Sequence, residues 1–174
     1  MNIKICSLVE TIDSLANNQF NNKHIISIWG CDFNKSNDFN VINKLSNKCK
    51  SIKFLVMDDI EEQIESEKYN LILPSKEIIN AAINWIKPKL NEEIVVHCAG
   101  GVSRSAALAF IINCIDNEPE EAMNILDFKF HWPNDLIIRL GAEILNKPSI
   151  ITIINNTKLI WHERDRKLNE TIIL

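Results

Sequence analysis

The sequence predicts one α/β domain in which a central, mostly parallel sheet is flanked by helices. Three observations lead to this prediction. The chain has 174 residues, about the size of one compact domain with a sizeable core. Short apolar runs rich in β-branched residues alternate with helical patterns, as in βαβ units. The C-terminal half is mostly helical in pattern, which supplies further helices to cover the sheet.

Composition and charge exclude several classes of protein. With 19 Lys and Arg against 23 Asp and Glu, the net charge is -4, so no electrostatic excess would drive non-specific binding to nucleic acid. Apolar residues make up 46% of the chain but never run for the ~18 positions that a membrane span requires. The five cysteines are odd in number and form no C-x-x-C pair, so neither a disulfide framework nor a zinc site is indicated.

The first fifteen residues do not form a targeting segment. Lys4, Glu10 and Asp13 interrupt the apolar run before a signal-type core can form. We therefore expect a cytoplasmic protein without a membrane span.

The N-terminal part alternates predicted strands with short helices. Apolar runs at 3–9, 24–30 and 51–58 are bounded by polar clusters and predict buried strands. A short helix is predicted at 11–20. Residues 31–50 are expected to form a loop with at most one or two helical turns.

A longer helix is predicted after Pro74. Ser75 can cap its N-terminus, Glu77 lies in its first turn, and apolar residues recur at helical spacing as far as Leu90. Residues 92–98 then predict a fourth short strand.

Helices are predicted for the rest of the chain. Residues 105–115 are apolar on nearly every face, which is typical of a buried helix. Pro119 opens another helix, 133–145 predicts an amphipathic one, and 148–168 predicts a long helix or a strand followed by a helix. The C-terminal helical region is thus expected at about 119–168. A basic cluster near its end is expected to form one face of the last helix, with a docking patch as the alternative: Arg164, Arg166 and Lys167.

The most informative segment joins the fourth predicted strand to the buried helix. It reads HCAGGVSRS, from His97 to Ser105. A glycine-rich loop can turn successive backbone N–H groups inward, and the helix N-terminus adds unpaired N–H groups and the positive end of its dipole. Arg104 adds a planar guanidinium that can bind two phosphate oxygens. Cys98, at the centre of these donors, is expected to act as a thiolate nucleophile.

This segment matches H-C-x-x-G-x-x-R-[ST] and resembles the signature of the cysteine-dependent protein tyrosine and dual-specificity phosphatases. Relatives of the compact dual-specificity type also carry an acidic residue some tens of residues before the cysteine, and a Pro-Asn pair that opens a later helix. Here MDDI supplies Asp58 and Asp59, and PNDLIIRL supplies Pro133 and Asn134. The resemblance covers roughly 50–145 and implies a fold like that of the tyrosine phosphatases.

The resemblance implies a single phosphatase domain over 1–174, with a role for each residue of the loop. Cys98 would attack phosphorus and form a phosphocysteine intermediate, while Arg104 holds the equatorial oxygens. His97 would fix the loop and help to set the ionisation of the thiol. Ser105 would donate to the leaving sulfur during hydrolysis; its structural alternative is a helix N-cap. The phosphate-binding groups of the loop would be those of Ala99, Gly100, Gly101, Val102, Ser103 and Arg104. No metal and no cofactor is needed.

Two neighbouring residues compete for the role of general acid. This group should protonate the leaving oxygen and then, as a base, activate water. Asp59 is favoured because it is the later of the two, where the loop leaves the strand; Asp58 is the alternative. The acidic stretch at 61–68 is expected to be a solvated loop that lengthens this segment.

The predicted activity is that of a protein phosphatase, with tyrosine or dual specificity, acting on a phosphoprotein. Phosphotyrosine is favoured if the cleft is deep. The alternatives are a phosphate-binding pseudophosphatase without turnover, and a phosphatase acting on a phosphoinositide or an RNA 5'-phosphate. The lack of Lys and Arg between Cys98 and Arg104 disfavours a highly charged inositol phosphate. A sulfur or phosphate carrier with the same C-x5-R spacing is disfavoured by Ser105 and the Pro-Asn helix.

Cys31 is a candidate for a second role near the loop. It follows the predicted strand at 24–30, so it is expected at the carboxyl edge of the sheet. There it would be either a plain structural cysteine or a resolving thiol for oxidised Cys98.

Overall fold

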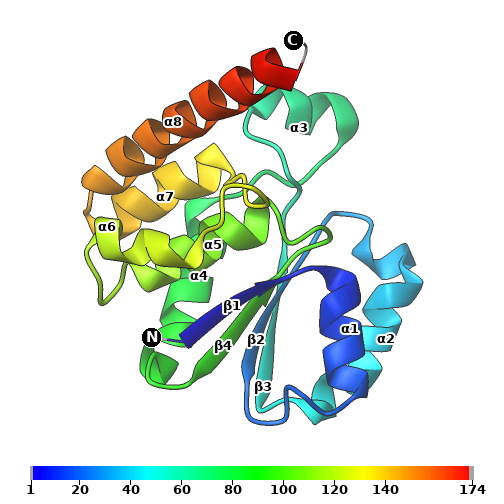
Figure 1. The fold of residues 1–174 in the computed structure, drawn as a ribbon. Helices are drawn as coiled ribbons and strands as arrows, with labels where there is room; N and C mark the ends of the chain where they lie inside the picture. Colours follow the sequence, from blue (N-terminus) through cyan, green and yellow to red (C-terminus); the bar gives the residue numbers. More distant parts are fainter. Residues whose placement is uncertain (1, 173–174) are drawn as a thin grey trace.

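A parallel sheet forms the centre of the protein (Figure 1). The computed structural model describes the backbone of residues 2–172 and the side chains of 2–163. Within this part the sheet has four strands in the order β1-β4-β2-β3, all parallel. The strands are β1 (Asn2–Cys6), β2 (His24–Trp29), β3 (Ser51–Val56) and β4 (Glu93–His97). The prediction of a single α/β domain with a parallel sheet is confirmed.

The register of the strands brings several chain segments to one edge of the sheet. His97 at the end of β4 lies opposite Cys6 of β1 and Ser27 of β2. Trp29 at the end of β2 lies opposite Val56 at the end of β3. Because all strands are parallel, the loops that follow them meet at this carboxyl edge.

Helices cover both faces of the sheet (Figure 1). One face carries α1 (Leu8–Ala16) and α2 (Asn37–Leu45). The other carries α4 (Lys76–Ile86) and α5 (Arg104–Asn113), with the later helices packed outside them. The cores follow the strand period of two, since Ile25 and Val95 belong to the α1 side whereas their neighbours Ile26 and Val96 belong to the larger core.

Helix α5 is buried along its whole length. Every one of its ten residues is buried, as its all-round apolar sequence predicts. It packs against β1 and β4 and is covered by α7 (Asp135–Leu145). At Gly141 of α7 an added Cβ would lie 2.5 Å from Ile111 of α5, so a glycine permits this close approach. The loop that precedes α5 is therefore joined to a helix that is fixed in place by packing on several sides.

The last helices complete the larger face. They are α6 (Pro119–Ala122), α7, and α8 (Ser149–Ile172), which is one continuous helix where a helix or a strand followed by a helix was predicted. The side chains of the basic residues expected on its face lie outside the described part: Arg164, Arg166 and Lys167. None of the helices in the described residues is both long and apolar enough to cross a membrane.

Two predicted boundaries are wrong in the N-terminal part. The first helix begins before residue 11, because the Ser7 side chain caps α1 by accepting a hydrogen bond from the Glu10 amide at 3.2 Å. The predicted loop at 31–50 contains the nine-residue helix α2, which Ser36 caps. Both caps are local side-chain to backbone bonds that a hydrophobic pattern does not show.

The acidic stretch after Asp59 also differs from the prediction. Instead of a loop it contains the short helix α3 (Gln63–Tyr69). This helix ends at Asn70, which adopts the left-handed conformation with φ of 53°. The connection that follows Asp59 is thus lengthened by a seven-residue helix with no buried residue, which lies above the carboxyl edge of the sheet in Figure 1.

Candidate active site

The segment His97–Ser105 lies between β4 and α5 at the carboxyl edge of the sheet. Three of its carbonyl groups accept backbone hydrogen bonds of 2.9 to 3.0 Å: Ala99 from Leu8, Val102 from Trp132, and Ser103 from Ala107. All described peptide bonds are trans, so the N–H of each following residue points away from these partners. The amides of Gly100, Ser103 and Arg104 each point away from the partner of the preceding carbonyl group, so these three hydrogen bonds leave them available to another acceptor. This arrangement suits an anion.

Gly101 is the position at which the loop needs a glycine. Its φ is +75°, and an added Cβ would lie 2.9 Å from the Cys6 carbonyl group and the Ser7 nitrogen. At Gly100 an added Cβ would have only an ordinary contact of 3.6 Å with Val102. Of the two glycines, only Gly101 packs closely against the turn between β1 and α1.

Cys98 and Ser105 form the centre of the loop. Cys98 is only 2% exposed, and its Sγ lies 3.2 Å from the Ser105 Oγ. Helix α5 begins at Arg104 with Ser103 in the N-cap position, so Ser105 lies inside the first turn. The alternative reading of Ser105 as an N-cap is therefore wrong. Its hydroxyl is free to donate to the sulfur.

His97 is buried beneath the loop. Its Nδ1 lies 3.4 Å from the Cys98 carbonyl oxygen, which only accepts, so the proton belongs on Nδ1. Burial lowers the pKa of His97 to about 4, so the ring is neutral at pH 7. Its contribution is a hydrogen bond and an edge contact with the Trp29 ring at 6.2 Å, and it brings no charge to the thiol.

Arg104 is anchored to the end of β3. Its Nη1 donates to the Met57 carbonyl oxygen at 3.0 Å, and the residue is 9% exposed. Its Nε is buried without a hydrogen-bond partner in the described residues and lies 3.8 Å from Asp59 Oδ2. A buried guanidinium with a spare N–H group is suited to a bound anion.

Asp59 contacts the loop at Ser103 and Arg104. Its Oδ1 accepts from the Ser103 hydroxyl at 2.7 Å and from the Asn134 side-chain amide at 3.0 Å. Its Oδ2 is the oxygen near Arg104. The sequence placed Asp59 and Asn134 in the resemblance to the phosphatases, but it gave no sign that Ser103 holds the carboxylate.

Asp58 joins two loops beside the cavity that Cys98 and Arg104 line. Its carboxylate accepts from the Cys31 amide, at 3.2 Å to each oxygen, and from the Ile72 amide at 2.8 Å. At Gly30 an added Cβ would lie 2.5 Å from Asp58 Oδ1. The two adjacent carboxylates thus have different environments, one bound to backbone amides and the other facing the loop arginine.

A cavity of about 350 Å³ opens beside Cys98 and Arg104. Most of its remaining wall is apolar and comes from the ends of β2 and α1 and the loops near them: Leu8, Ile28, Trp29, Phe33 and Leu71. Asp58 and Cys31 also line it. The nucleophile candidate therefore lies beside an apolar space large enough for a small aromatic group.

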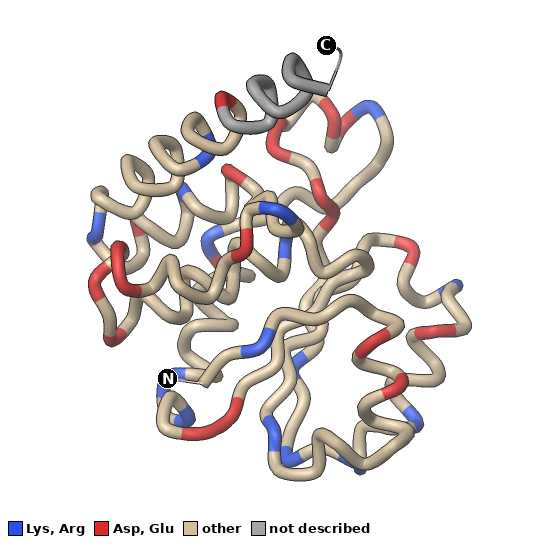
Figure 2. The backbone as a smooth tube through the Cα atoms, viewed as in Figure 1, with Lys and Arg blue, Asp and Glu red and all other residues tan. Residues whose placement is uncertain are grey.

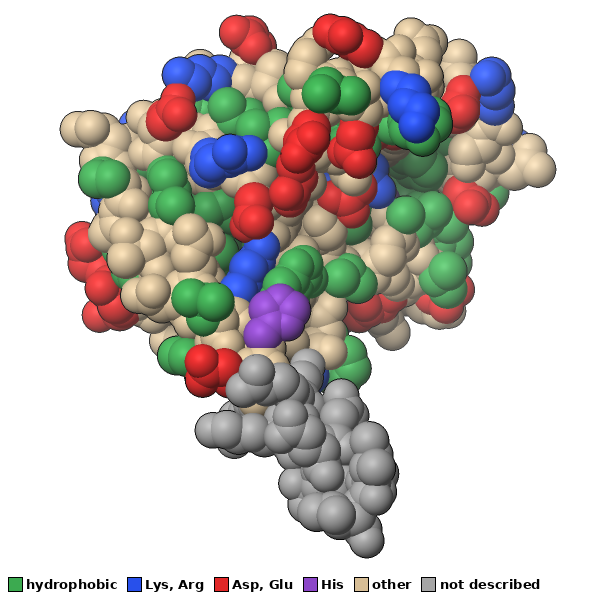
Figure 3. All heavy atoms as spheres, turned by 90° about the horizontal axis from the view of Figure 1, so that it is seen from above, with side chains coloured by type: hydrophobic (Ala, Val, Ile, Leu, Met, Phe, Trp, Pro, Cys, Tyr) green, Lys and Arg blue, Asp and Glu red, His purple; other side chains and the backbone are tan. Residues whose placement is uncertain are grey.

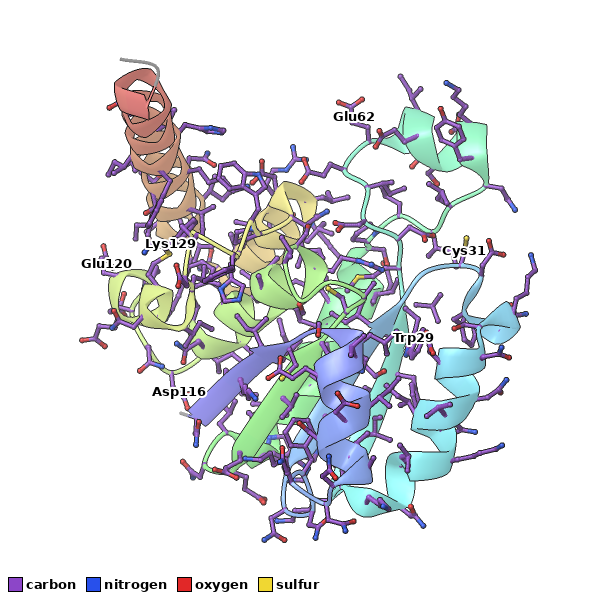
Figure 4. All side chains as sticks on the ribbon, turned by 45° about the vertical axis from the view of Figure 1, so that its right-hand side comes forward. Trp29, Cys31, Glu62, Asp116, Glu120 and Lys129 are labelled. Atoms are coloured by element: carbon purple, nitrogen blue, oxygen red, sulfur yellow. The ribbon has the colours of Figure 1, made fainter. Side chains whose placement is uncertain are left out.

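Cys31 lies where the sequence predicted, just beyond the end of β2. Figure 4 shows it on the loop that follows Trp29, with its sulfur pointing outward from that loop. Partial burial and the contact with Asp58 raise the pKa of its thiol. Cys31 and Cys98 are both free thiols, and a disulfide between them would require this loop to turn inward.

Charge is unevenly distributed over the sheet edge. Along the chain, basic and acidic residues are interspersed (Figure 2). Seen from above Figure 1, acidic side chains gather in the middle of the surface (Figure 3). The connection at 58–67 alone carries six acidic residues. Within the described part, no group of three or more His, Cys, Asp or Glu side chains could hold a metal ion.

Comparisons with known proteins agree with this geometry at the level of the fold. No protein-family model matches the sequence, and a search of curated proteins gives no match. The structure is similar to that of PTPMT1 in complex with PI(5)P, with a TM-score of 0.57 and 13% identity over 90% of this chain and 94% of that one. It is also similar to DUSP15, with a TM-score of 0.52 and 17% identity over 89% and 91% of the chains.

A third similar structure is the PTP-2 phosphatase of Cydia pomonella, with a TM-score of 0.52 and 15% identity over 80% of this chain and 83% of that one. The chain therefore has the fold of the tyrosine and dual-specificity phosphatases.

Proposed function

We propose that the protein is a phosphatase of the tyrosine or dual-specificity class that works through a phosphocysteine intermediate. The observation that carries the proposal is the placement of Cys98 beside Ser105, in the loop that also carries the buried Arg104, with Asp59 near the Arg104 guanidinium. These groups supply a nucleophile, a phosphate clamp and an acid within one edge of the sheet. Residues 1–174 then act as a single phosphatase domain.

In the first step the Cys98 thiolate attacks phosphorus and the bond from phosphorus to the leaving oxygen breaks. Asp59 gives its proton to that oxygen. The amides of the loop and Arg104 hold the equatorial oxygens, where negative charge is shared in the transition state.

In the second step a water molecule attacks the phosphocysteine. Asp59, now a carboxylate, takes the proton of the water, and the bond from phosphorus to sulfur breaks. Ser105 donates a hydrogen bond to the departing thiolate, and inorganic phosphate leaves. No metal ion takes part in either step.

The substrate we propose is an aryl phosphate on a protein, with phosphotyrosine favoured over phosphoserine and phosphothreonine. The apolar cavity beside Cys98 suits a phenyl ring. The acidic connection at 58–67 disfavours polyanions by repulsion. Although PTPMT1 was crystallised with PI(5)P, the loop here has no Lys or Arg between Cys98 and Arg104.

The test is hydrolysis of phenyl phosphate and of a phosphotyrosine peptide in the presence of a chelator. We expect turnover that Cys98→Ser abolishes. A phosphoserine peptide, PI(5)P and a 5'-phosphorylated RNA serve as competing substrates, and faster turnover of any of them would replace the substrate proposed. A protein that binds vanadate through Arg104 but releases no phosphate would be a binding module without catalytic activity.

A further inference from the structure

A buried ammonium group from α8 holds the turn that precedes α7. Lys158 is 8% exposed, and its Nζ donates to the Pro133 carbonyl oxygen at 2.7 Å and to Asp135 Oδ1 at 2.5 Å. The same Nζ lies 5.1 Å from the centre of the Trp132 ring. A buried cation requires such partners, and all of these belong to the turn at 132–135.

This turn also contacts both loops of the candidate active site. It makes four hydrogen bonds to them. The Trp132 amide donates to Val102 O at 2.9 Å, Asn134 Nδ2 donates to Asp59 Oδ1 at 3.0 Å and to Ile60 O at 3.4 Å, and the Asp135 amide donates to Glu61 Oε1 at 2.6 Å. Lys158 therefore does not contact the acid loop or the phosphate loop itself. It contacts the turn that is hydrogen-bonded to both of them. It does not line the cavity beside Cys98.

The hydrogen bonds to Asp59 determine which of its oxygens can act. Oδ1 accepts from both Ser103 and Asn134, so Oδ2 is the oxygen left to carry a proton. Oδ2 is also the oxygen near Arg104. If the carboxyl group rotated, its proton would no longer be held in this orientation. The side chains that donate to Oδ1 must therefore be held in place.

We propose that Lys158 is a positioning residue for the general acid, acting through the turn at 132–135 to hold Asn134 against Asp59. The inference rests on the proposed phosphatase function. Lys158 acts on the orientation of the proton donor, not on the bound phosphate. Its loss should therefore affect the reactions that most need a proton delivered to the leaving oxygen.

The experiment compares two substrates that differ in this need. Phenyl phosphate releases a weakly acidic phenol and needs the proton, whereas p-nitrophenyl phosphate releases a more acidic phenol and needs it less. For each, kcat/KM is measured for the wild type and Lys158→Met. Lys147→Met is the matched control. Lys147 Nζ likewise makes two hydrogen bonds, here to the backbone oxygens of Cys114 and Asn117 at 3.0 and 3.1 Å, but away from the acid loop.

We expect Lys158→Met to lower kcat/KM about tenfold for phenyl phosphate and at most about twofold for p-nitrophenyl phosphate, a fraction of a general acid's full contribution. Lys147→Met should change both substrates equally. In an Asp59→Ala background, Lys158→Met should cause no further loss with phenyl phosphate, because the group that it positions is gone.

Equal losses for both substrates, or a full additional loss in the Asp59→Ala background, would show that Lys158 has only a structural role. If Lys158→Met does not fold, Asp135→Asn carries the same comparison, and an unchanged ratio of the two substrates then overturns the inference. If the wild type releases no more phosphate than Cys98→Ser, the proposed function itself fails, which is a different result.

Discussion

The Asn134 side-chain amide lies 3.0 Å from Asp59 Oδ1, although 75 residues separate the two in the sequence. The same Asn134 caps α7 by accepting a hydrogen bond from the Ile137 amide at 3.0 Å. The side-chain oxygen of Asn134 therefore caps α7, and its side-chain nitrogen donates a hydrogen bond to Asp59.

Asn134→Ala is expected to lose both contacts. Loss of the cap should lower the free energy of unfolding by about 1 kcal/mol. Loss of the contact to Asp59 should also lower kcat/KM for phenyl phosphate about tenfold. Ser75→Ala is the matched control, because Ser75 caps α4 through the Ile78 amide but does not touch Asp59. An unchanged kcat/KM in Asn134→Ala would show that Asn134 does not help to position Asp59.

The two adjacent aspartates should respond differently to substitution. Asp59→Asn is expected to lower kcat/KM for phenyl phosphate by roughly 10² to 10⁴ with little loss of stability. Asp58→Asn weakens the bonds from the Cys31 and Ile72 amides, so it should lower the free energy of unfolding by about 1 to 3 kcal/mol while keeping most of the activity. Steady-state kinetics and urea unfolding measure both effects. The reverse order would make Asp58 the acid.

Stability should depend on pH through His97. Burial lowers the pKa of this ring from 6.5 to about 4 in the folded protein. Between these values the unfolded chain binds a proton that the folded protein does not, so stability present above pH 6.5 is lost as the pH falls toward 4. The loss is up to about 3 kcal/mol. Urea unfolding at several pH values should show a shallower decline in His97→Gln, and equal slopes for the two proteins would contradict this.

The two glycines of the loop should tolerate substitution unequally. Gly101→Ala must place a Cβ 2.9 Å from the backbone of Cys6 at a φ of +75°. It should cost about 1 to 3 kcal/mol and weaken vanadate binding, because the loop has to move. Gly100→Ala meets only Val102 at 3.6 Å and should bind vanadate nearly as well as the wild type. Thermal unfolding and vanadate titration provide the comparison, which fails if the two variants are alike.

The parallel sheet, and the place of the segment at 97–105 between a strand and a buried helix, could be predicted because their signals are local. Each strand is a short apolar run, and the residues from Cys98 to Ser105 are adjacent in the sequence. Helix α3 was missed because its pattern is mainly polar. Helix α2 was missed because its apolar residues at helical spacing, Phe39, Ile42 and Leu45, are spread over only nine residues, and the caps at Ser7 and Ser36 depend on single side chains.

The support of the acid could not be predicted because it depends on tertiary contacts. Nothing in the order of residues shows that Ser103 donates to Asp59, or that Lys158 reaches back to Pro133. Asp58 and Asp59 are adjacent in the sequence, and their tertiary contacts distinguish them: Asp58 accepts from the Cys31 and Ile72 amides, whereas Asp59 accepts from the Ser103 and Asn134 side chains. Such contacts arise after the sheet and its covering helices are in place.

The pairing of β1 with β4 joins residues 2–6 to residues 93–97. Because such a distant pairing closes a long loop, it is slow to form compared with any single helix. Gly101 rests on Cys6, so the phosphate loop acquires its shape only after this pairing. During refolding, the activity that releases phosphate from phenyl phosphate should therefore recover after the helix content has recovered. The recovery of this activity would mark the completion of the native sheet.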